Sequence, residues 1–294
     1  MTDMETQPVP SLSSIGRILT RRELTHRRTG HYEPKGKKYP ELPAIMPNQT
    51  HQLDLVGPCY LTGPTRFYSL HIVDVAINRC GIEPMPSKAA QSIIDAVHTV
   101  WKRTGIPENM QVDNEVAFFG SPAYPRGMGP LIRLCLHYGV SLWFIPPSEP
   151  WWNGVVEKFN DHYRQKFLAK VVMASMCALR QESLAFEYRH NSTYRYSKIK
   201  GKTPLKALAS MDKKVVFPIM DDAPKHPLDK PVEGCYHFVR FIRNDQRLNI
   251  FGEMFPVPPE TQYEYVVATI DVKEQKLKLF LDHVQLEEYN YQLR

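Results

Sequence analysis

The sequence of 294 residues lacks any apolar run close to the roughly 20 residues that a membrane-spanning helix needs. Its polar, proline-containing start also lacks the basic and then apolar pattern of a signal peptide. These two absences predict a chain that has no membrane partner and stays in the cytoplasm.

Cysteine is also scarce. Five cysteines are scattered along the chain without a Cys-x-x-Cys pair, and no pair of histidines has zinc-finger spacing. The sequence therefore predicts neither a disulfide framework nor a structural zinc site. It contains no internal repeat and no low-complexity tract. With 43% hydrophobic residues it can bury a substantial core, and its length suggests about two domains.

Positive charge is concentrated near the start of the chain. Residues 11–39 contain eight Lys and Arg against two Glu, and this difference of six equals the formal net charge of +6. Apolar residues at helical spacing predict a short basic helix over residues 11–24. Such a helix cannot fold alone, so it is either the last helix of a helix-turn-helix unit or an arm that orders on a partner. The run of charge itself predicts either a solvated tail or an arm that binds a polyanion. The candidate contacts are Arg17, Arg21, Arg22, Arg27 and Arg28.

The middle of the chain begins with strands and continues with alternating helices and strands. Three strands in this position, followed by helices and two more strands, predict an α/β fold with a mixed five-stranded sheet flanked by helices. The expected strands are residues 51–56, 66–75, 79–85, 109–112 and 141–144, and the expected helices are residues 88–104, 128–138, 152–170, 176–190 and a short helix that starts at Pro204.

The end of the chain has a different pattern. Residues 211–232 contain four prolines and predict a linker. Five short runs of alternating apolar residues follow, which predict a small β-barrel over residues 233–294. The expected domains are thus a basic arm over residues 1–50, a core with trailing helices over residues 51–210, the linker over residues 211–232, and the barrel.

Three acidic residues come from separate predicted elements of the core. Asp54 lies in the first strand, Asp113 follows the fourth strand, and Glu157 lies one turn into a helix behind a proline-rich loop. Because the first and fourth strands would be neighbours in such a sheet, the carboxylates of Asp54 and Asp113 are expected to lie close together. Glu157 reaches the same edge if the loop packs against the sheet.

These acids predict a metal site. A carboxylate inside a strand is disfavoured and costly to bury, and a divalent cation would compensate for it. Mg²⁺ or Mn²⁺ prefers carboxylate oxygens, and two such ions about 4 Å apart support in-line phosphoryl displacement. We therefore expect two ions on Asp54, Asp113 and Glu157, and phosphodiester chemistry. Glu149 and Glu115 are rival third ligands, ranked behind Glu157 because of their positions in the loops.

Residues 51–170 resemble the catalytic core of retroviral integrases and prokaryotic insertion-sequence transposases of the DDE type, which has an RNase H-like fold. The matching pieces are Asp54 in Gln-Leu-Asp-Leu, Asp113-Asn114 after a strand, and the highly specific motif Asn153-Gly154-Val155-Val156-Glu157-Lys158-Phe159-Asn160. The resemblance implies that Asp54, Asp113 and Glu157 form a metal-binding catalytic triad. It also implies hydrolysis at a DNA 3′ end followed by strand transfer, that is, DNA integration and recombination.

The chain departs from this pattern in ways that favour a bacterial-type transposase of a mobile element. Asp113 and Glu157 are separated by 43 residues, more than in retroviral integrases, and the zinc-binding His/Cys domain of those enzymes is absent. Glu115 stands where a glycine usually follows Asp-Asn. The basic helix resembles the last helix of the helix-turn-helix of such transposases, without the helices before it, and the terminal strands resemble the SH3-like barrel that follows their core.

The motif helix also predicts DNA contacts. Asn153, Glu157, Asn160 and Arg164 share one helical face, with Lys158 beside it, and this face is expected to meet DNA. The resemblance implies double-stranded DNA of the element ends and target as partner, a homo-multimer assembled on DNA, and accessory transposition proteins. It places the protein in the prokaryotic cytoplasm, associated with the nucleoid.

Two other functions stay open. The incomplete DNA-binding unit fits a catalytically silent, DNA-binding remnant of a transposase. The same fold would also serve an RNase H-like nuclease that hydrolyses DNA without strand transfer. The intact triad argues against the remnant, whereas the basic arm and the terminal barrel, which suit long duplex contacts, argue against the simple nuclease.

Overall fold

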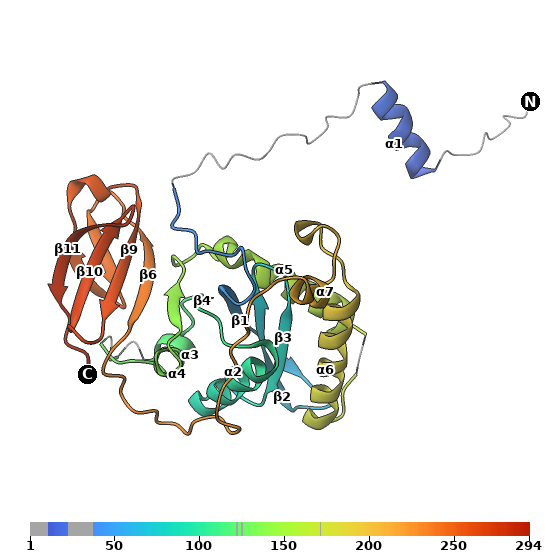
Figure 1. The fold of residues 1–294 in the computed structure, drawn as a ribbon, viewed down its shortest axis with the longest axis horizontal. Helices are drawn as coiled ribbons and strands as arrows, with labels where there is room; N and C mark the ends of the chain where they lie inside the picture. Colours follow the sequence, from blue (N-terminus) through green and yellow to red (C-terminus); the bar gives the residue numbers. More distant parts are fainter. Residues whose placement is uncertain (1–10, 23–37, 122, 125, 171) are drawn as a thin grey trace, which may run out of the picture. The chain divides into compact units, whose positions relative to one another are not determined.

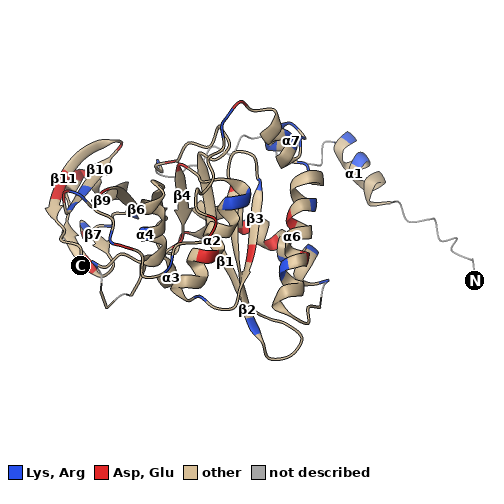
Figure 2. Cartoon of the chain, turned by 60° about the horizontal axis from the view of Figure 1, so that its bottom comes forward, with Lys and Arg blue, Asp and Glu red and all other residues tan. Residues whose placement is uncertain are grey.

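A computed structural model describes residues 11–22, 38–121, 123–124, 126–170 and 172–294. The chain divides into two compact units, residues 1–36 and 37–294. In the first unit the described element is helix α1 (Leu12–Arg21), where Ser11 accepts a hydrogen bond from the backbone N–H of Ser14 at 3.2 Å as the N-cap. All its residues are exposed, and Figure 2 shows basic but no acidic positions on it. Arg27 and Arg28 lie outside the described residues.

The second unit is built on one nine-stranded mixed sheet with the order β11-β10-β9-β6-β5-β4-β1-β2-β3 (Figure 1). Strands β1, β2 and β3 pair antiparallel, whereas β4 and β5 follow β1 in parallel. The mixed sheet flanked by helices is therefore confirmed, and the five expected core strands are part of a larger sheet. These strands are β1 (Thr50–Tyr60), β2 (Arg66–Asp74), β3 (Cys80–Met85), β4 (Asn109–Val112) and β5 (Ser141–Phe144).

Helices cover both faces of this core sheet. One face packs against α2 (Ala90–Thr104), α3 (Val116–Phe119) and α4 (Pro130–His137), and the other against α5 (Gly154–Tyr163) and α6 (Met176–Thr193). Helix α5 continues into a π-helical turn, Arg164–Leu168, and α7 (Pro204–Ala209) packs on α6. In the part of the chain that the structure describes, no helix is long and apolar enough to cross a membrane.

Alternation along the strands decides which residues meet which helices. Leu53 of β1 and Ile72 of β2 point into the core with α2 and α4, whereas Val73 points into the core with α5 and α6. Successive residues of a strand face opposite sides of a sheet, so Gln52 and Asp54 lie on the α5 side of β1. The candidate acids are thus on the face that the motif helix covers.

The terminal strands do not form the expected barrel. Strand β6 (Cys235–Phe241) pairs in parallel with β5, and β9 (Tyr265–Asp271), β10 (Lys276–Leu281) and β11 (Val284–Asn290) extend the core sheet beyond it. Strands β7 (Arg247–Ile250) and β8 (Glu253–Pro256) form a separate hairpin. No closed barrel forms among the described residues, because the free edge of β5 receives β6 and the buried Tyr236 and Phe238 join the main core. The domain boundaries themselves stay a prediction.

Candidate active site

Asp54 and Asp113 lie side by side on neighbouring parallel strands. Strands β1 and β4 pair with Gln52 opposite Gln111, and the two aspartates each follow two residues later. Asp54 is inside β1, whereas Asp113 is the first residue after β4. Since residues two apart in a strand face the same side, both carboxylates belong to the face that α5 covers. The expectation that the two strands are neighbours is confirmed.

Two glutamines hold the start of α5 against this face. The side-chain oxygen of Gln52 accepts hydrogen bonds from the backbone N–H groups of Val155, at 2.9 Å, and Val156, at 3.1 Å. The side-chain amides of Gln52 and Gln111 both donate to the carbonyl oxygen of Trp152, the former at 3.1 Å. The first N–H groups of a helix have no partner within it, so Gln52 takes the place of a helix cap and fixes α5 beside Asp54. Neither glutamine is predicted from the sequence to be part of the site.

Asn153 strengthens the same attachment. Its side-chain amide donates to the carbonyl oxygen of Leu53 at 3.1 Å, and only 2% of the residue is exposed. The sequence analysis expects Asn153 at a DNA-contacting face, but the structure places it between the turn before α5 and strand β1. Its role in the fold is to anchor the loop that carries the motif.

Asn160 is buried in the same way. Only 2% of it is exposed, its amide nitrogen donates to Asp54 Oδ2 at 2.6 Å, and its oxygen lies 2.6 Å from Nδ1 of His71. The sequence analysis expects this residue at the DNA as well. In the structure both polar atoms of its side chain are bonded inside the protein, and a contact between Asn160 and DNA stays a prediction.

Glu157 lies in the first turn of α5. The three carboxyl groups are close enough to affect one another electrostatically: burial is the main cause of each raised pKa, and the charge of a second acid of the three adds to it. Burial and the charge of Asp54 raise the pKa of Asp113 to about 6. For Asp54, hydrogen bonds from the Leu55 N–H and from Asn160 partly oppose the rise in pKa.

Cationic partners for these acids are missing from the described part of the chain. Within the described ranges, none of the three carboxylates forms an ion pair with a Lys, Arg or His. Lys88 instead pairs with Glu115 at 2.8 Å and lowers the pKa of Asp113 only from a distance. The three acids therefore leave a local excess of negative charge that a cation would stabilise.

The two rival ligands are engaged elsewhere. Glu149 Oε2 accepts hydrogen bonds from Trp152 Nε1 at 2.8 Å and from the Tyr265 hydroxyl at 2.6 Å, and Glu115 is held by Lys88. Glu157 has no hydrogen-bond or ion-pair partner in the part of the chain that the structure describes. Of the three glutamates, Glu157 is thus the one whose oxygens are available.

The donor set fits a divalent cation in kind, since carboxylate oxygens are the ligands that Mg²⁺ and Mn²⁺ prefer. Its arrangement is looser than that of a formed site. Among the described residues, no three His, Cys, Asp or Glu side chains are gathered closely enough to hold a metal ion. The three acids lie on one face and affect one another's pKa, but their oxygens do not surround a single ion position.

Basic side chains lie around this face rather than in it. Lys158 and Arg164 are exposed on and just beyond α5, and Arg164 lies 3.6 Å from Asp161 in an exposed pair. The charge of Arg164 lowers the pKa of Asp54, which places it near the acids. Arg17, Arg21 and Arg22 are exposed on α1, in the other unit.

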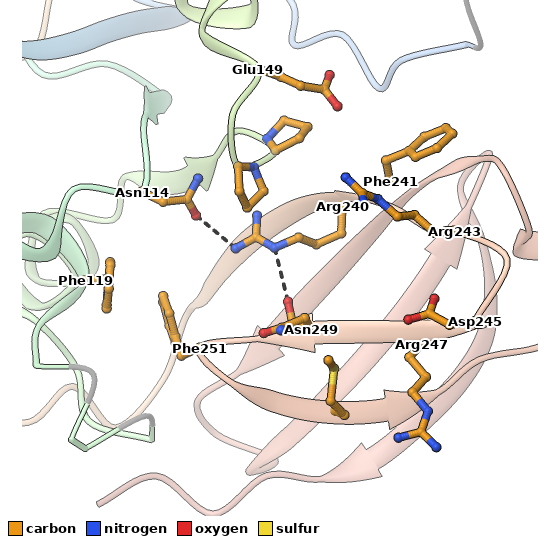
Figure 3. Close-up of a pocket in the computed structure, with 13 residues that line it drawn as sticks. Asn114, Phe119, Glu149, Arg240, Phe241, Arg243, Asp245, Arg247, Asn249 and Phe251 are labelled. Carbon is orange, nitrogen blue, oxygen red and sulfur yellow. Dashed lines mark hydrogen bonds between the residues drawn. The ribbon is translucent and has the colours of Figure 1, made fainter.

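A cavity of about 550 Å³ lies between the loop of residues 146–149 and the terminal strands (Figure 3). Asn114 lines it, and the Asn114 side-chain oxygen accepts a hydrogen bond from Arg240 Nη2 at 2.9 Å. Arg243 and Arg247 lie at its exposed side, and Phe119 stacks on Phe251 with ring centroids 4.2 Å apart.

Arg240 is the charged residue at the base of this cavity. It is 7% exposed, and its other N–H groups donate to the carbonyl oxygens of Ile145, Val239 and Asn249. Burial lowers its pKa to about 10, and it has no ion pair with a carboxylate among the described residues. The sequence analysis missed Arg240. The available signal was a cation at an inward-facing position, in phase with the buried Tyr236 and Phe238.

No protein-family model matches the chain, and no curated protein matches it. Among solved structures it is similar to the HTLV-2 integrase catalytic core domain in complex with magnesium. The trimeric form is 17% and the dimeric form 16% identical in sequence to this chain, and each has a TM-score of 0.43. Each match covers 56% of this chain and 99% of the integrase chain. It is also similar to the simian T-cell lymphotropic virus intasome in complex with PP2A regulatory subunit B56 gamma, at 14% identity, a TM-score of 0.44, and 87% and 84% coverage. The bacterial-type origin stays a prediction.

Proposed function

We propose that this chain is a DNA transposase or integrase of the DDE type, with an RNase H-like core that cleaves DNA 3′ ends and transfers them to a target. One observation carries the proposal. Asp54, Asp113 and Glu157 come from three separate elements, lie on one face, raise one another's pKa, and have no cation partner among the described residues.

In this proposal the three carboxylates hold two Mg²⁺ or Mn²⁺ ions. When bound, such ions activate a water or 3′-hydroxyl and stabilise the leaving oxygen in an in-line displacement. The protein supplies the geometry. Asn160 and the Leu55 N–H hold Asp54, the Glu115 N–H donates to Asp113 Oδ1 at 3.1 Å, and Gln52 and Gln111 hold the start of the helix that carries Glu157.

The DNA partner is inferred from the basic side chains around the acids. Lys158 and Arg164 on one side, and Arg243 and Arg247 on the other, can contact phosphates of a strand whose reacting phosphate lies at the triad. The arginines of α1 would add sequence-independent contacts. Assembly as a homo-multimer on element ends, with accessory transposition proteins, belongs to the same proposal.

A direct assay tests this function. The protein is incubated with Mn²⁺, a target plasmid and labelled duplexes that end in the sequences flanking the gene, and Asp113→Asn is run beside it. Joined product that the substitution abolishes is the expected result. Cleaved but unjoined product would instead identify an RNase H-like nuclease.

The alternative of a silent, DNA-binding remnant has one observation in its favour, which is that no closed metal site forms among the described residues. It predicts that the unmutated protein neither cleaves nor joins the duplex in Mn²⁺. It also predicts that the protein still retards the duplex on a gel, and that Asp113→Asn binds DNA at least as tightly.

A further inference from the structure

Behind Asp54 runs a chain of three buried polar side chains from two elements. Asn160 of α5 contacts Asp54, His71 of β2 contacts Asn160, and Ser69 lies 3.0 Å from Nε2 of His71. His71 is the residue paired directly opposite Asp54 in the antiparallel β1–β2 ladder. The backbone register thus brings His71 beside Asp54, and α5 inserts Asn160 between them.

The chemistry of the groups fixes the direction of each hydrogen bond. Asn160 donates its amide N–H to Asp54 Oδ2, so its oxygen faces His71 and can only accept. His71 therefore carries its proton on Nδ1. His71 is fully buried, and burial lowers its pKa to about 4, so the ring is neutral and Nε2 accepts from the Ser69 hydroxyl.

The His71 ring has no freedom to turn. It meets the rings of Phe159 and Tyr163 edge-on, with centroids 5.2 and 4.5 Å away, and its two nitrogens are bonded at opposite ends. An ordinary core histidine needs only satisfied nitrogens. Here the bonds join one acid of the proposed triad to the middle of the sheet.

We propose that His71 is a positioning residue: through Asn160 it holds one oxygen of Asp54 in place, so that the carboxylate meets a divalent cation in a single orientation. This inference rests on the proposed function. Ligand-orienting partners of this kind typically contribute tenfold to a hundredfold to metal affinity.

Two substitutions whose side chains are nearly isosteric with each other separate the effect of the His71–Asn160 hydrogen bond from the effect of packing. His71→Asn places an amide N–H where Nδ1 stood, whereas His71→Leu has the same shape without a donor. Both remove the ring contacts and the bond to Ser69. His71→Leu also leaves the buried Asn160 oxygen without a donor, so it should be the less stable variant, and affinities are compared where both variants are folded. Mn²⁺ affinity, measured by calorimetry, should fall at least about tenfold further in His71→Leu than in His71→Asn. Equal affinities in the two variants would overturn the proposal.

A second histidine in the sheet serves as the control. His237 of β6 is partly buried, also has a pKa that burial lowers to about 4, and contacts Thr269 at 2.9 Å and Ser141 at 3.0 Å. His237→Leu should reduce the thermal unfolding midpoint without changing Mn²⁺ affinity. A loss of Mn²⁺ affinity equal to that of His71→Leu would assign the effect to general loosening instead.

One measurement needs no metal and no activity. Long-range ¹⁵N–¹H NMR of the imidazole rings should show His71 protonated on Nδ1. A proton on Nε2 would overturn the proposed role of His71. If the unmutated protein fails to bind Mn²⁺ and to process DNA, the proposed function fails. The NMR result separately decides whether the hydrogen bonds from His71 to Asn160 and Ser69 run in the proposed direction.

Discussion

Two neighbouring regions of the second unit carry opposite charge, and neither is neutralised by an ion pair among the described residues. The acid face has Asp54, Asp113 and Glu157, and the cavity beside it has Arg240 at its base. Asn114 joins the two, because it follows Asp113 in the chain and accepts a hydrogen bond from Arg240.

The two regions differ in how their burial is compensated. Arg240 donates to three backbone carbonyls and one amide, so the positive charge is held by the fold as it stands. The acids accept few hydrogen bonds, and Glu157 accepts none from the described residues. A buried charge without hydrogen bonds is costly. The acid face thus has a charge that the described residues leave largely uncompensated, whereas the charge at the base of the cavity is held by the fold.

The sharpest way to break this comparison is to remove one acid. Glu157→Gln should lower strand-transfer activity by about a thousandfold, since metal ions contribute several kcal/mol to such transition states. The fold should be unaffected, because the change removes like charge from a crowded face. Product formation on a sequencing gel measures the activity, and urea unfolding measures the stability. A Glu149→Gln variant is the matched control, since Glu149 is engaged with Trp152 and Tyr265 and should retain activity.

The next effect concerns stability rather than activity. Arg240→Met should lower the free energy of unfolding by about 2–3 kcal/mol, because it leaves the Asn114 side-chain oxygen without its Arg240 donor and removes hydrogen bonds to three backbone carbonyl oxygens. Arg243→Met, on the exposed rim, should change it by less than about 0.5 kcal/mol. Equal losses in the two variants would show that Arg240 is not the structural cation described above.

Much of the fold was predictable because its patterns are local. The apolar residues of the helix expected over residues 88–104, such as Ile93, Val97 and Trp101, have helical spacing, and all are buried in α2. The pairing of β1 with β4 followed from the order of strands and helices, which places the acids of two distant segments on one edge. The expected helix over residues 152–170 also holds, apart from the turn of 3-10 helix at its start and the π-helical turn at its end.

What escaped prediction depends on partners far away in sequence. Gln52 contacts residues about a hundred positions later, and nothing near Gln52 identifies that partner. The terminal strands look alike in sequence whether they close on themselves or continue another sheet, so the free edge of β5 decided the outcome. Asn153 and Asn160 share a helical face with Glu157, but spacing could not tell that this face is turned toward β1 and β2.

A smaller effect tests the charge of the acid face through pH. The pKa of Asp113 is raised to about 6 in the folded protein, so between pH 4 and 6 the folded state keeps a proton that the unfolded state has lost. Stability from this group therefore falls as pH rises through that window. Buried histidines act in the opposite direction, so the informative quantity is the difference between the unmutated protein and Asp113→Asn.

That difference should grow from near zero below pH 4 to about 2 kcal/mol in favour of Asp113→Asn above pH 6, which is the roughly 3 kcal/mol of the full pKa difference reduced for the partial exposure of Asp113 to solvent. Saturating Mn²⁺ should remove the advantage at pH 7, because the cation binds only the unmutated acids tightly. Chemical unfolding at fixed ionic strength across the pH range gives both curves. Parallel curves with and without Mn²⁺ would show that the acid face binds no cation.

The smallest effect concerns the exposed rim of the cavity. If Arg243 and Arg247 each contact a phosphate, replacing either by Ala should weaken DNA binding modestly and reduce the slope of log affinity against log salt by about one. Lys273→Ala is the control, because this exposed lysine lies on the turn between β9 and β10, outside the cavity lining. Binding measured by fluorescence anisotropy at four salt concentrations separates the cases. A slope unchanged in all three variants would show that the arginines at the cavity do not contact DNA. The DNA strand would then have to reach the acids from the side of Lys158 and Arg164.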